Sequence, residues 1–231
     1  MHNLVTYPLA ILLTILAYLI GIVIYRKSGS PFLNPIIVAL LLLALVVHFT
    51  PLNWNDYIIG SRPIIQLLPL TIIVLALPLY RQLPLLKKHH KAILAGTVAG
   101  VITSALSLFV LARMMGIDHE LLRSILPKSI TTPLGLSLSR SLGALEGITV
   151  ISIVTTGILG IVFYLPVFKL FKIHHPIAKG VALGTASHAV GTSKAIELGE
   201  VEGAMSSLSI LISGVITLIA TPLLLLLLSI Y

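Results

Sequence analysis

The sequence contains no cysteine among its 231 residues, which excludes disulfide bonds and thiolate metal sites. Charged side chains are also scarce, at 10% of the residues, whereas an average soluble domain has roughly 25%. Hydrophobic residues make up 57% of the chain, and the mean hydropathy is +1.10. This composition excludes an ordinary soluble domain and predicts an integral membrane protein.

The net charge of +8 does not indicate nucleic-acid binding, because the basic residues lie in short clusters between apolar runs. Such clusters are typical of the cytoplasmic loops of membrane proteins. The N-terminus lacks a basic stretch, and the apolar run after it is too long for a signal peptide, so we expect a retained first helix. No soluble region or long linker interrupts the chain, which predicts a single membrane domain over residues 1–231.

Long apolar stretches alternate with short polar or proline-rich interruptions. Tyr7 to Tyr25 comprises 19 residues. Because a helix rises about 1.5 Å per residue, this length suffices to cross roughly 30 Å of hydrocarbon. Pro69 and Pro78 interrupt the run from Pro63 to Tyr80, which predicts a kinked or broken span there. The full spans that we expect are 7–25, 31–49, 92–111, 147–171 and 204–229.

The segments between these spans predict caps and loops. Asn34 and Asp118 each precede a helical stretch and are expected to cap it. Residues 51–62 are expected to form a polar loop, and residues 81–91, which include His89-His90, a solvated basic loop. Small residues on the following span are assigned to close helix packing, namely Gly96, Thr97, Gly100, Thr103 and Ser104.

Two polar breaks interrupt the apolar pattern, Pro127–Pro133 and Gly184–Lys194. Polar groups at membrane depth are costly and commonly mark a pathway or binding site. The first break separates His119–Leu126 from Leu134–Leu142, and neither piece is long enough to span alone. Irregular backbone of this kind is tolerated at membrane depth only where protein or a cavity surrounds it. Both breaks therefore predict re-entrant or discontinuous helices, with Gly184 permitting close backbone approach.

The basic clusters predict an orientation. Placing those near Arg26, Arg81 and Lys169 in the cytoplasm requires both broken segments to return to the side from which they entered. Because the kinked span at 63–80 also crosses in this orientation, both chain ends then lie outside. If the broken segments crossed fully, Lys169 and Lys172 would lie outside, which the positive-inside rule disfavours. The sequence thus predicts an all-α polytopic membrane protein with about five full transmembrane helices plus two broken or re-entrant helical hairpins.

The two breaks share a pattern that suggests an inverted repeat, although a chance similarity explains it equally well. Thr132-Pro133 and Thr192-Ser193 are each typical of a helix start. An ionisable residue, Lys128 or His188, lies four positions before each threonine. If the hairpins enter from opposite faces, their helix N-termini point toward each other. Together with Lys128 they would form a site for a small anion.

We expect the polar residues of both breaks to bind the substrate. Lys128 is the expected anion ligand, and a lysine that reaches the membrane interface is the alternative. The imidazole of His188 has an ordinary pKa of about 6.5 and is the candidate for coupling transport to protons, with a hydrogen-bonded core histidine as the alternative. The predicted binding residues are Lys128, Ser129, Thr131, Thr132, Thr185, Ser187, His188, Gly191 and Thr192, and the candidate coupling residues are His188, Lys194 and Glu197.

The pattern does not indicate an enzyme. Ser187 and His188 are adjacent, so on a helix they point apart, and no acid is placed to orient the histidine as a catalytic base. His89-His90 lacks a third metal ligand nearby, so we expect no metal site. Lys194 and Glu197 are compatible with an ordinary surface ion pair as well as with coupling. We expect no cofactor beyond a coupling proton or sodium ion.

These stretches resemble the LrgB/CidB family of membrane proteins. The resemblance depends on residues 126–133, 156–160 and, above all, 179–195 with its Thr-Ala-Ser-His-Ala-Val-Gly-Thr-Ser core, and it continues through 197–204. The chain departs from the family pattern at residues 68–71 and 143–147. The resemblance covers nearly the whole chain, and it implies the bacterial cytoplasmic membrane as the location.

The resemblance implies two functions. Bacterial members are described as holin-like or antiholin-like proteins that modulate murein hydrolase activity and autolysis beside a smaller LrgA/CidA-type membrane partner. A plastid relative carries glycolate and glycerate, and bacterial members are linked to pyruvate movement. A lesion-forming protein needs no buried lysine, histidine or paired helix ends. The residues therefore favour a homo-oligomeric secondary transporter of small monocarboxylates that works by alternating access, with the antiholin-like role as the alternative.

Overall fold

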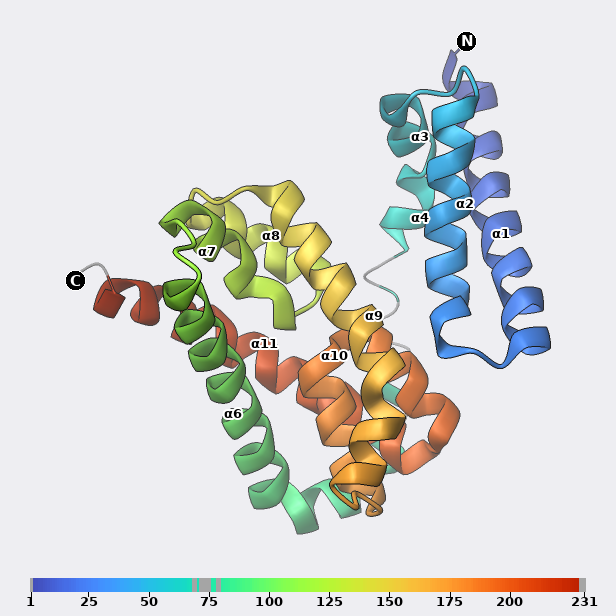
Figure 1. Ribbon diagram of the computed structural model, residues 1–231. Helices are drawn as coiled ribbons and strands as arrows, with labels where there is room; N and C mark the ends of the chain where they lie inside the picture. Colours follow the sequence, from blue (N-terminus) through green and yellow to red (C-terminus); the bar gives the residue numbers. More distant parts are fainter. Residues whose placement is uncertain (1, 68–69, 71–75, 78–79, 229–231) are drawn as a thin grey trace. The chain divides into compact units, whose positions relative to one another are not determined.

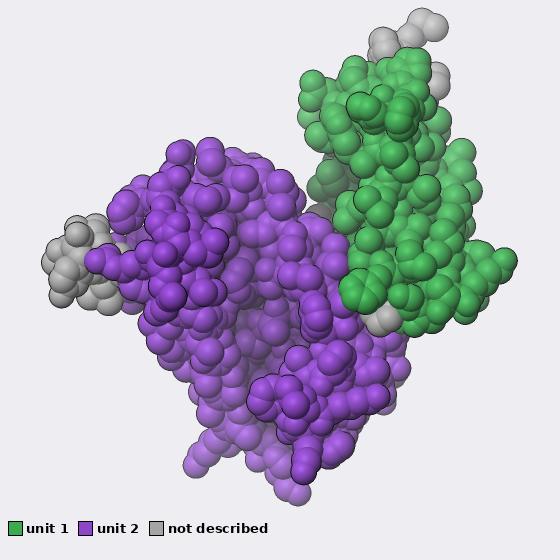
Figure 2. Space-filling view, viewed as in Figure 1, with its two compact units in different colours: residues 1–74 green, residues 75–231 purple. Residues whose placement is uncertain are grey.

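The computed structural model describes residues 2–67, 70, 76–77 and 80–228, and it divides the chain into two compact units, residues 1–74 and 75–231 (Figure 2). The described residues form helices and contain no strand (Figure 1). Four described helices are long and apolar enough to cross a membrane, and one shorter apolar helix accompanies them. The all-α polytopic fold is thus confirmed. The long candidate spans are Tyr7–Ser28, Leu83–Met114, Glu146–Leu170 and Glu200–Leu226.

The first unit is built on two apolar helices that lie side by side and are joined by a short turn (Figure 1). Ala17 packs against Ala39 and Leu43 in its core. Asn34 caps the second helix as predicted, because its Oδ1 accepts a hydrogen bond of 2.9 Å from the Ile36 amide. The elements of this unit are α1 (His2–Ser28), η1 (Pro31–Leu33), α2 (Pro35–Phe49), α3 (Trp54–Gly60) and α4 (Arg62–Gln66).

The predicted polar loop at residues 51–62 is wrong, since most of it forms helix α3. The helix begins because Asn53 Oδ1 accepts a hydrogen bond of 2.8 Å from the Asp56 amide, a side-chain cap within a stretch that looks loop-like by composition. The kinks predicted at Pro69 and Pro78 lie outside the described residues.

The second unit contains the rest of the described helices. The predicted basic loop at residues 81–91 is wrong from Leu83 onward, because α6 begins there and continues to Met114. Lysine and leucine favour helices, so the span extends beyond its apolar part with its charges exposed. The elements of this unit are α6 (Leu83–Met114), α7 (His119–Ile125), η2 (Leu126–Ser129), α8 (Thr132–Ser141), α9 (Glu146–Leu170), α10 (Pro176–Leu198) and α11 (Glu200–Leu228).

Helices α10 and α11 pack closely at the centre of this unit (Figure 1). Gly184 makes this possible, because a Cβ atom there would lie 2.8 Å from the Ser206 Cα. The close backbone approach predicted for Gly184 is therefore present. The neighbouring core contains Ile93 of α6, Ile177 of α10 and Met205 of α11. The unit is thus held by contacts between its first and last helices, with α10 between them.

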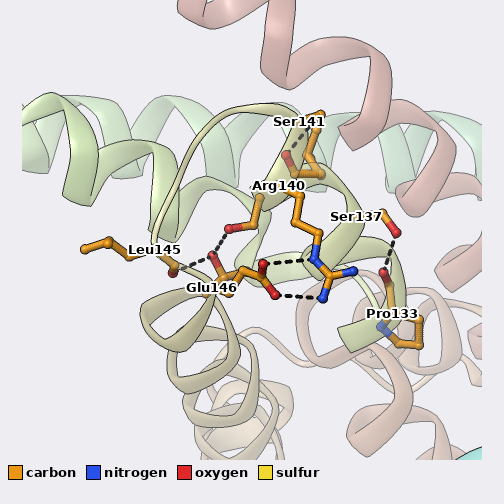
Figure 3. A network of polar contacts seen from close by, with 9 residues as sticks. Pro133, Ser137, Arg140, Ser141, Leu145 and Glu146 are labelled. Carbon is orange, nitrogen blue, oxygen red and sulfur yellow. Dashed lines mark hydrogen bonds and ion pairs between the residues drawn. The ribbon is translucent and has the colours of Figure 1, made fainter.

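An exposed ion pair closes the turn between α8 and α9 (Figure 3). Arg140 Nε and Nη2 each donate a hydrogen bond of 2.9 Å to the Glu146 carboxylate, so the pairing is bidentate. Gly143 lies between them with a φ of +60°, a conformation that favours glycine. This turn is one of the two places where the chain departs from the family pattern.

Candidate functional site

The first broken segment is a hairpin formed by α7, η2 and α8. Asp118 Oδ1 caps α7 as predicted, accepting a hydrogen bond of 2.7 Å from the Leu121 amide. Thr149 Oγ1 of α9 lies 2.8 Å from the Ser124 carbonyl oxygen of α7 and 2.9 Å from Ser139 Oγ of α8. One residue of α9 therefore contacts both arms of the hairpin. The chain turns at η2 and returns to the end from which it entered.

The turn of this hairpin carries Lys128. Its Nζ donates a hydrogen bond of 2.7 Å to Ser104 Oγ of α6 and one of 3.2 Å to Ser129 Oγ. The two serine oxygens are 3.1 Å apart, so the three polar groups form a closed cluster. Among the described residues no carboxylate oxygen lies within 4.0 Å of this ammonium. The two hydrogen bonds of this ammonium are therefore both to neutral hydroxyls, and one of its three N–H donors remains for a ligand.

The second broken segment is α10, which changes direction at His188. This residue has non-helical backbone angles, φ 40° and ψ −126°. Leu183 before the break and Ala195 after it pack in one cluster with Phe168, near the end of α9. A continuous helix would separate Leu183 and Ala195 by about 18 Å, so the contact shows that α10 folds back on itself. Gly191 permits the reversal, because a Cβ atom there would lie 2.6 Å from Ser187 Cβ.

His188 lies where the two hairpins meet. The residue is only 2% exposed, and its ring is close to the backbone of both Lys128 and Ile153 of α9. Its Nε2 atom is buried and has no hydrogen-bonding partner among the described residues. A φ of +40° is unfavourable for a residue with a Cβ atom. His188 thus has a backbone conformation that favours glycine.

Two glycines of α9 pack against this turn of α10. A Cβ atom at Gly157 would lie 3.0 Å from His188 Cε1, and one at Gly160 would overlap Ser187 Oγ. Any larger side chain on this face of α9 would displace the turn of the second hairpin. Both glycines belong to the stretch at residues 156–160 that carries part of the family resemblance.

A cavity of about 620 Å³ lies between α6, η2 and the first arm of α10. Its volume is within the range of roughly 300–1,000 Å³ that small-molecule sites occupy. Of the predicted binding residues, Lys128, Ser129 and Thr185 line it. Thr185 Oγ1 is buried and makes no hydrogen bond to any described residue, so its hydrogen-bonding capacity is unused. The remaining lining is apolar or glycine apart from Ser104, His89 and His175.

The cavity reaches the protein surface beside two histidines. The rings of His89 on α6 and His175 at the start of α10 have centroids 6.4 Å apart, and His175 is exposed. Lys87 and Lys88, on the same turn of α6 as His89, are exposed as well. The mouth of the cavity beside His175 is therefore basic.

The other predicted binding residues lie near the cavity without lining it. Thr131, rather than Thr132, is the N-cap of α8, one residue earlier than predicted, and it makes no side-chain capping bond. The second half-helix begins after His188, so the prediction of a helix start at Thr192 is wrong. Thr192 is buried within that half-helix, where its Oγ1 lies 2.7 Å from Ser206 Oγ. The remaining members, Ser187 and Gly191, are buried in the turn itself.

The candidate coupling residues lie in two different parts of the unit. Lys194 Nζ pairs with Glu197 at 2.8 Å and lies 5.8 Å from the ring centre of Tyr164. Neither Lys194 nor Glu197 lines the cavity. Only His188 is close to Lys128.

Polar residues on the helices that surround the hairpins were not among the predicted site residues. Ser104 was assigned to packing, although it is the nearest partner of Lys128. The hydroxyls of α11 recur every three or four residues, a spacing that places them on one face of the helix and that could have revealed them. These buried side chains are Ser206, Ser209, Ser213, Thr217 and Thr221.

Comparisons with known proteins agree with the resemblance. The model of a family described as the LrgB-like family matches residues 14–227. The uncharacterized protein YxaC of Bacillus subtilis (strain 168) is 38% identical over 206 residues, which cover 89% of this chain and 90% of the relative. The antiholin-like protein LrgB of Bacillus cereus (strain B4264) is 34% identical over 223 residues, covering 96% of this chain and 97% of the relative. No solved structure matches the chain.

Proposed function

The chain belongs to the LrgB-like family of multi-pass bacterial membrane proteins, and we propose that it carries small carboxylate anions across the membrane. One observation carries this proposal. The Lys128 ammonium faces a cavity and is surrounded by hydroxyls, with no carboxylate within 4.0 Å among the described residues.

The positive charge of Lys128 favours an anion as the ligand of this cavity. An ammonium removed from bulk water is costly unless an opposite charge or several hydrogen bonds compensate it. The two serine hydroxyls compensate only part of that cost, because they are neutral. A bound carboxylate would supply the missing charge. The cavity therefore favours an anion over a neutral solute or a cation.

A hydroxyl in the cavity favours anions that carry a second oxygen group. Thr185 Oγ1 lines the same cavity as Lys128 and has no partner among the described residues. A carboxylate on Lys128 leaves a 2-oxo or 2-hydroxy oxygen of the same molecule for Thr185. Pyruvate, lactate, glycolate and glycerate all have this pair of groups. The alanines, Val181 and Ile177 that complete the lining suit the short carbon chains of these acids.

The basic mouth of the cavity would attract such anions. Charges of one sign around an opening raise the local concentration of an oppositely charged solute. By the positive-inside rule, this end faces the cytoplasm. We propose alternating access, in which the two hairpins move together past the remaining helices. His188 is the proposed coupling residue for a proton or a sodium ion, because its ring contacts the backbone that carries Lys128.

Uptake into liposomes tests the proposal. Purified protein is expected to take up labelled pyruvate, lactate, glycolate or glycerate, and Lys128→Ala is expected to abolish uptake while the protein remains folded. Arg113→Ala is the matched control, since Arg113 is exposed at the opposite end of α6 from the basic mouth and does not line the cavity. Full activity in Lys128→Ala would contradict the assignment of the site.

The names of the relatives favour a second function. Several are described as antiholin-like protein LrgB, which points to a role in controlling membrane lesions and murein hydrolases. For this chain such a role would require an LrgA-type partner or a homo-oligomer. Liposomes distinguish the two functions. Release of large uncharged dyes that scales with oligomerisation would favour the second function, whereas saturable uptake of small acids alone favours the first.

A further inference from the structure

A second, smaller cavity lies on the other side of Lys128. Its volume is about 20 Å³, and it shares Ser104, Lys128 and Ser129 with the large cavity. The rest of its lining comes from α11, including Thr217 and Thr221, and from apolar residues of α6 and η2. The Lys128 cluster thus separates a wide cavity from a narrow one.

Thr217 is distinct from the other hydroxyls on its helix. Its side chain is 5% exposed, and its Oγ1 has no hydrogen-bonding partner among the described residues. By contrast, Ser213 Oγ donates a hydrogen bond of 3.0 Å to the Ile210 carbonyl oxygen, although it is buried on the same helix. A buried hydroxyl without a partner is unfavourable. The small cavity is large enough for about one water molecule, which would satisfy it.

Thr217 and Thr221 also place two neighbouring hydroxyls next to the Lys128 cluster. They are four residues apart, so they are neighbours on one face of α11. Leu108, Leu126 and Leu224 line the same cavity and leave no room for a carboxylic acid. An anion that left Lys128 away from the wide cavity would meet these two hydroxyls first, once the leucines had moved apart.

We propose that the transport path continues past Lys128 between α6 and α11, that this half is closed in the present structure, and that Thr217 is the next residue to bind the anion. This inference rests on the proposed function. It assigns the wide cavity to one side of the membrane and the Thr217 cavity to the other, with the Lys128 cluster as the boundary.

Cysteine labelling tests the path without requiring transport. The chain has no native cysteine, so single substitutions can be introduced directly. Ala182→Cys, in the wide cavity, is expected to react with an impermeant thiol reagent added on the side of the basic loops. Thr217→Cys is expected to react only from the opposite side, and at least about fivefold faster when pyruvate is present on both sides. Ser213→Cys, which lines neither cavity, is expected to stay unlabelled.

Two outcomes would overturn the path. One is reaction of Thr217→Cys from the basic side at the rate of Ala182→Cys. The other is no reaction of Thr217→Cys from either side, with or without pyruvate, while Ala182→Cys reacts. If the predicted labelling pattern is found but wild-type protein takes up none of the acids, the two-cavity path stands and the proposed substrate class fails.

Uptake by hydroxyl-deletion variants gives an independent readout. Thr217→Val keeps the shape of the side chain and removes its hydroxyl, and we expect it to lower the maximal uptake rate about tenfold. The substrate concentration at half-maximal uptake should change little, because binding from the wide cavity does not involve Thr217. Ser213→Ala is the control and should transport like the wild type. Wild-type uptake in Thr217→Val would overturn the role of Thr217.

Discussion

Replacing Lys128 with methionine should weaken anion binding and stabilise the protein at the same time. Methionine has about the length of the lysine stem but no charge. The serine oxygens that Lys128 contacts are 3.1 Å apart, so they can bond to each other after the substitution. No polar group is then left without a partner, and the cost of holding a charge at membrane depth disappears.

The two effects can be given magnitudes. A hydrogen bond between charged groups contributes about 1.5–3 kcal/mol, which corresponds to a loss of affinity of about 10- to 100-fold. A lysine at the centre of a membrane helix costs about 2.5–3.5 kcal/mol. Because two hydroxyls already offset part of that cost, we expect a gain in stability of about 1–2 kcal/mol. This gain corresponds to a rise in melting temperature of about 2–8 °C for a chain of this size.

Two assays on the same detergent-solubilised sample measure these changes. A thermal melt without ligand gives the stability, and the shift of the melt with added pyruvate gives the binding. Lys128→Met should melt at a higher temperature than the wild type and show no pyruvate shift. Arg113→Met, at an exposed position that lines neither cavity, should match the wild type in both. A lower melting temperature with a retained pyruvate shift would refute the reasoning, because Lys128 would then be a structural residue.

Three further predictions follow from the contacts around the second hairpin and from the turn before α9. Gly160→Ala should lower stability by about 1–3 kcal/mol and reduce uptake, because the added methyl group overlaps Ser187; Gly147→Ala on the same helix meets nothing within 4 Å and should be neutral in a thermal melt. His188→Gly should retain or raise the melting temperature, since glycine accepts a positive φ, yet lose coupled uptake; a lower melting temperature would show that the imidazole mainly supports the fold. Glu146→Gln removes an exposed ion pair and should leave the melting temperature unchanged, so a clear drop would contradict its assignment as a surface contact.

The sequence was sufficient to predict the two breaks and the return of each hairpin to its entry side. A piece of eight or nine apolar residues cannot cross a membrane, and irregular backbone must be shielded from lipid, so length and hydropathy alone point to buried hairpins. The basic clusters then select the re-entrant arrangement over full crossing. The proximity of Lys128 and His188 follows from the same argument, because the polar turns are the parts that must avoid lipid.

The sequence pattern did not predict the residue at which the second hairpin turns. Threonine is a common N-cap, so Thr192 is the natural start of a helix, but the chain turns at His188 instead. A histidine at positive φ is uncommon, and only tertiary contacts determine it. The prediction of a loop for the basic segment at the start of α6 is wrong for a similar reason, since exposed lysines are compatible with either structure.

Lys128 and His188 both lower the stability of the fold that contains them. Methionine at 128 would avoid the cost of an ammonium without a carboxylate partner, and glycine at 188 would avoid backbone strain of about 1–3 kcal/mol. The two residues come from different hairpins, and the ring of one is close to the backbone of the other. A change of charge or hydrogen bonding at His188 must therefore act on the peptide that positions Lys128. Packing alone does not require this arrangement, and the proposed anion carrier, which links binding to a second ion, would use it.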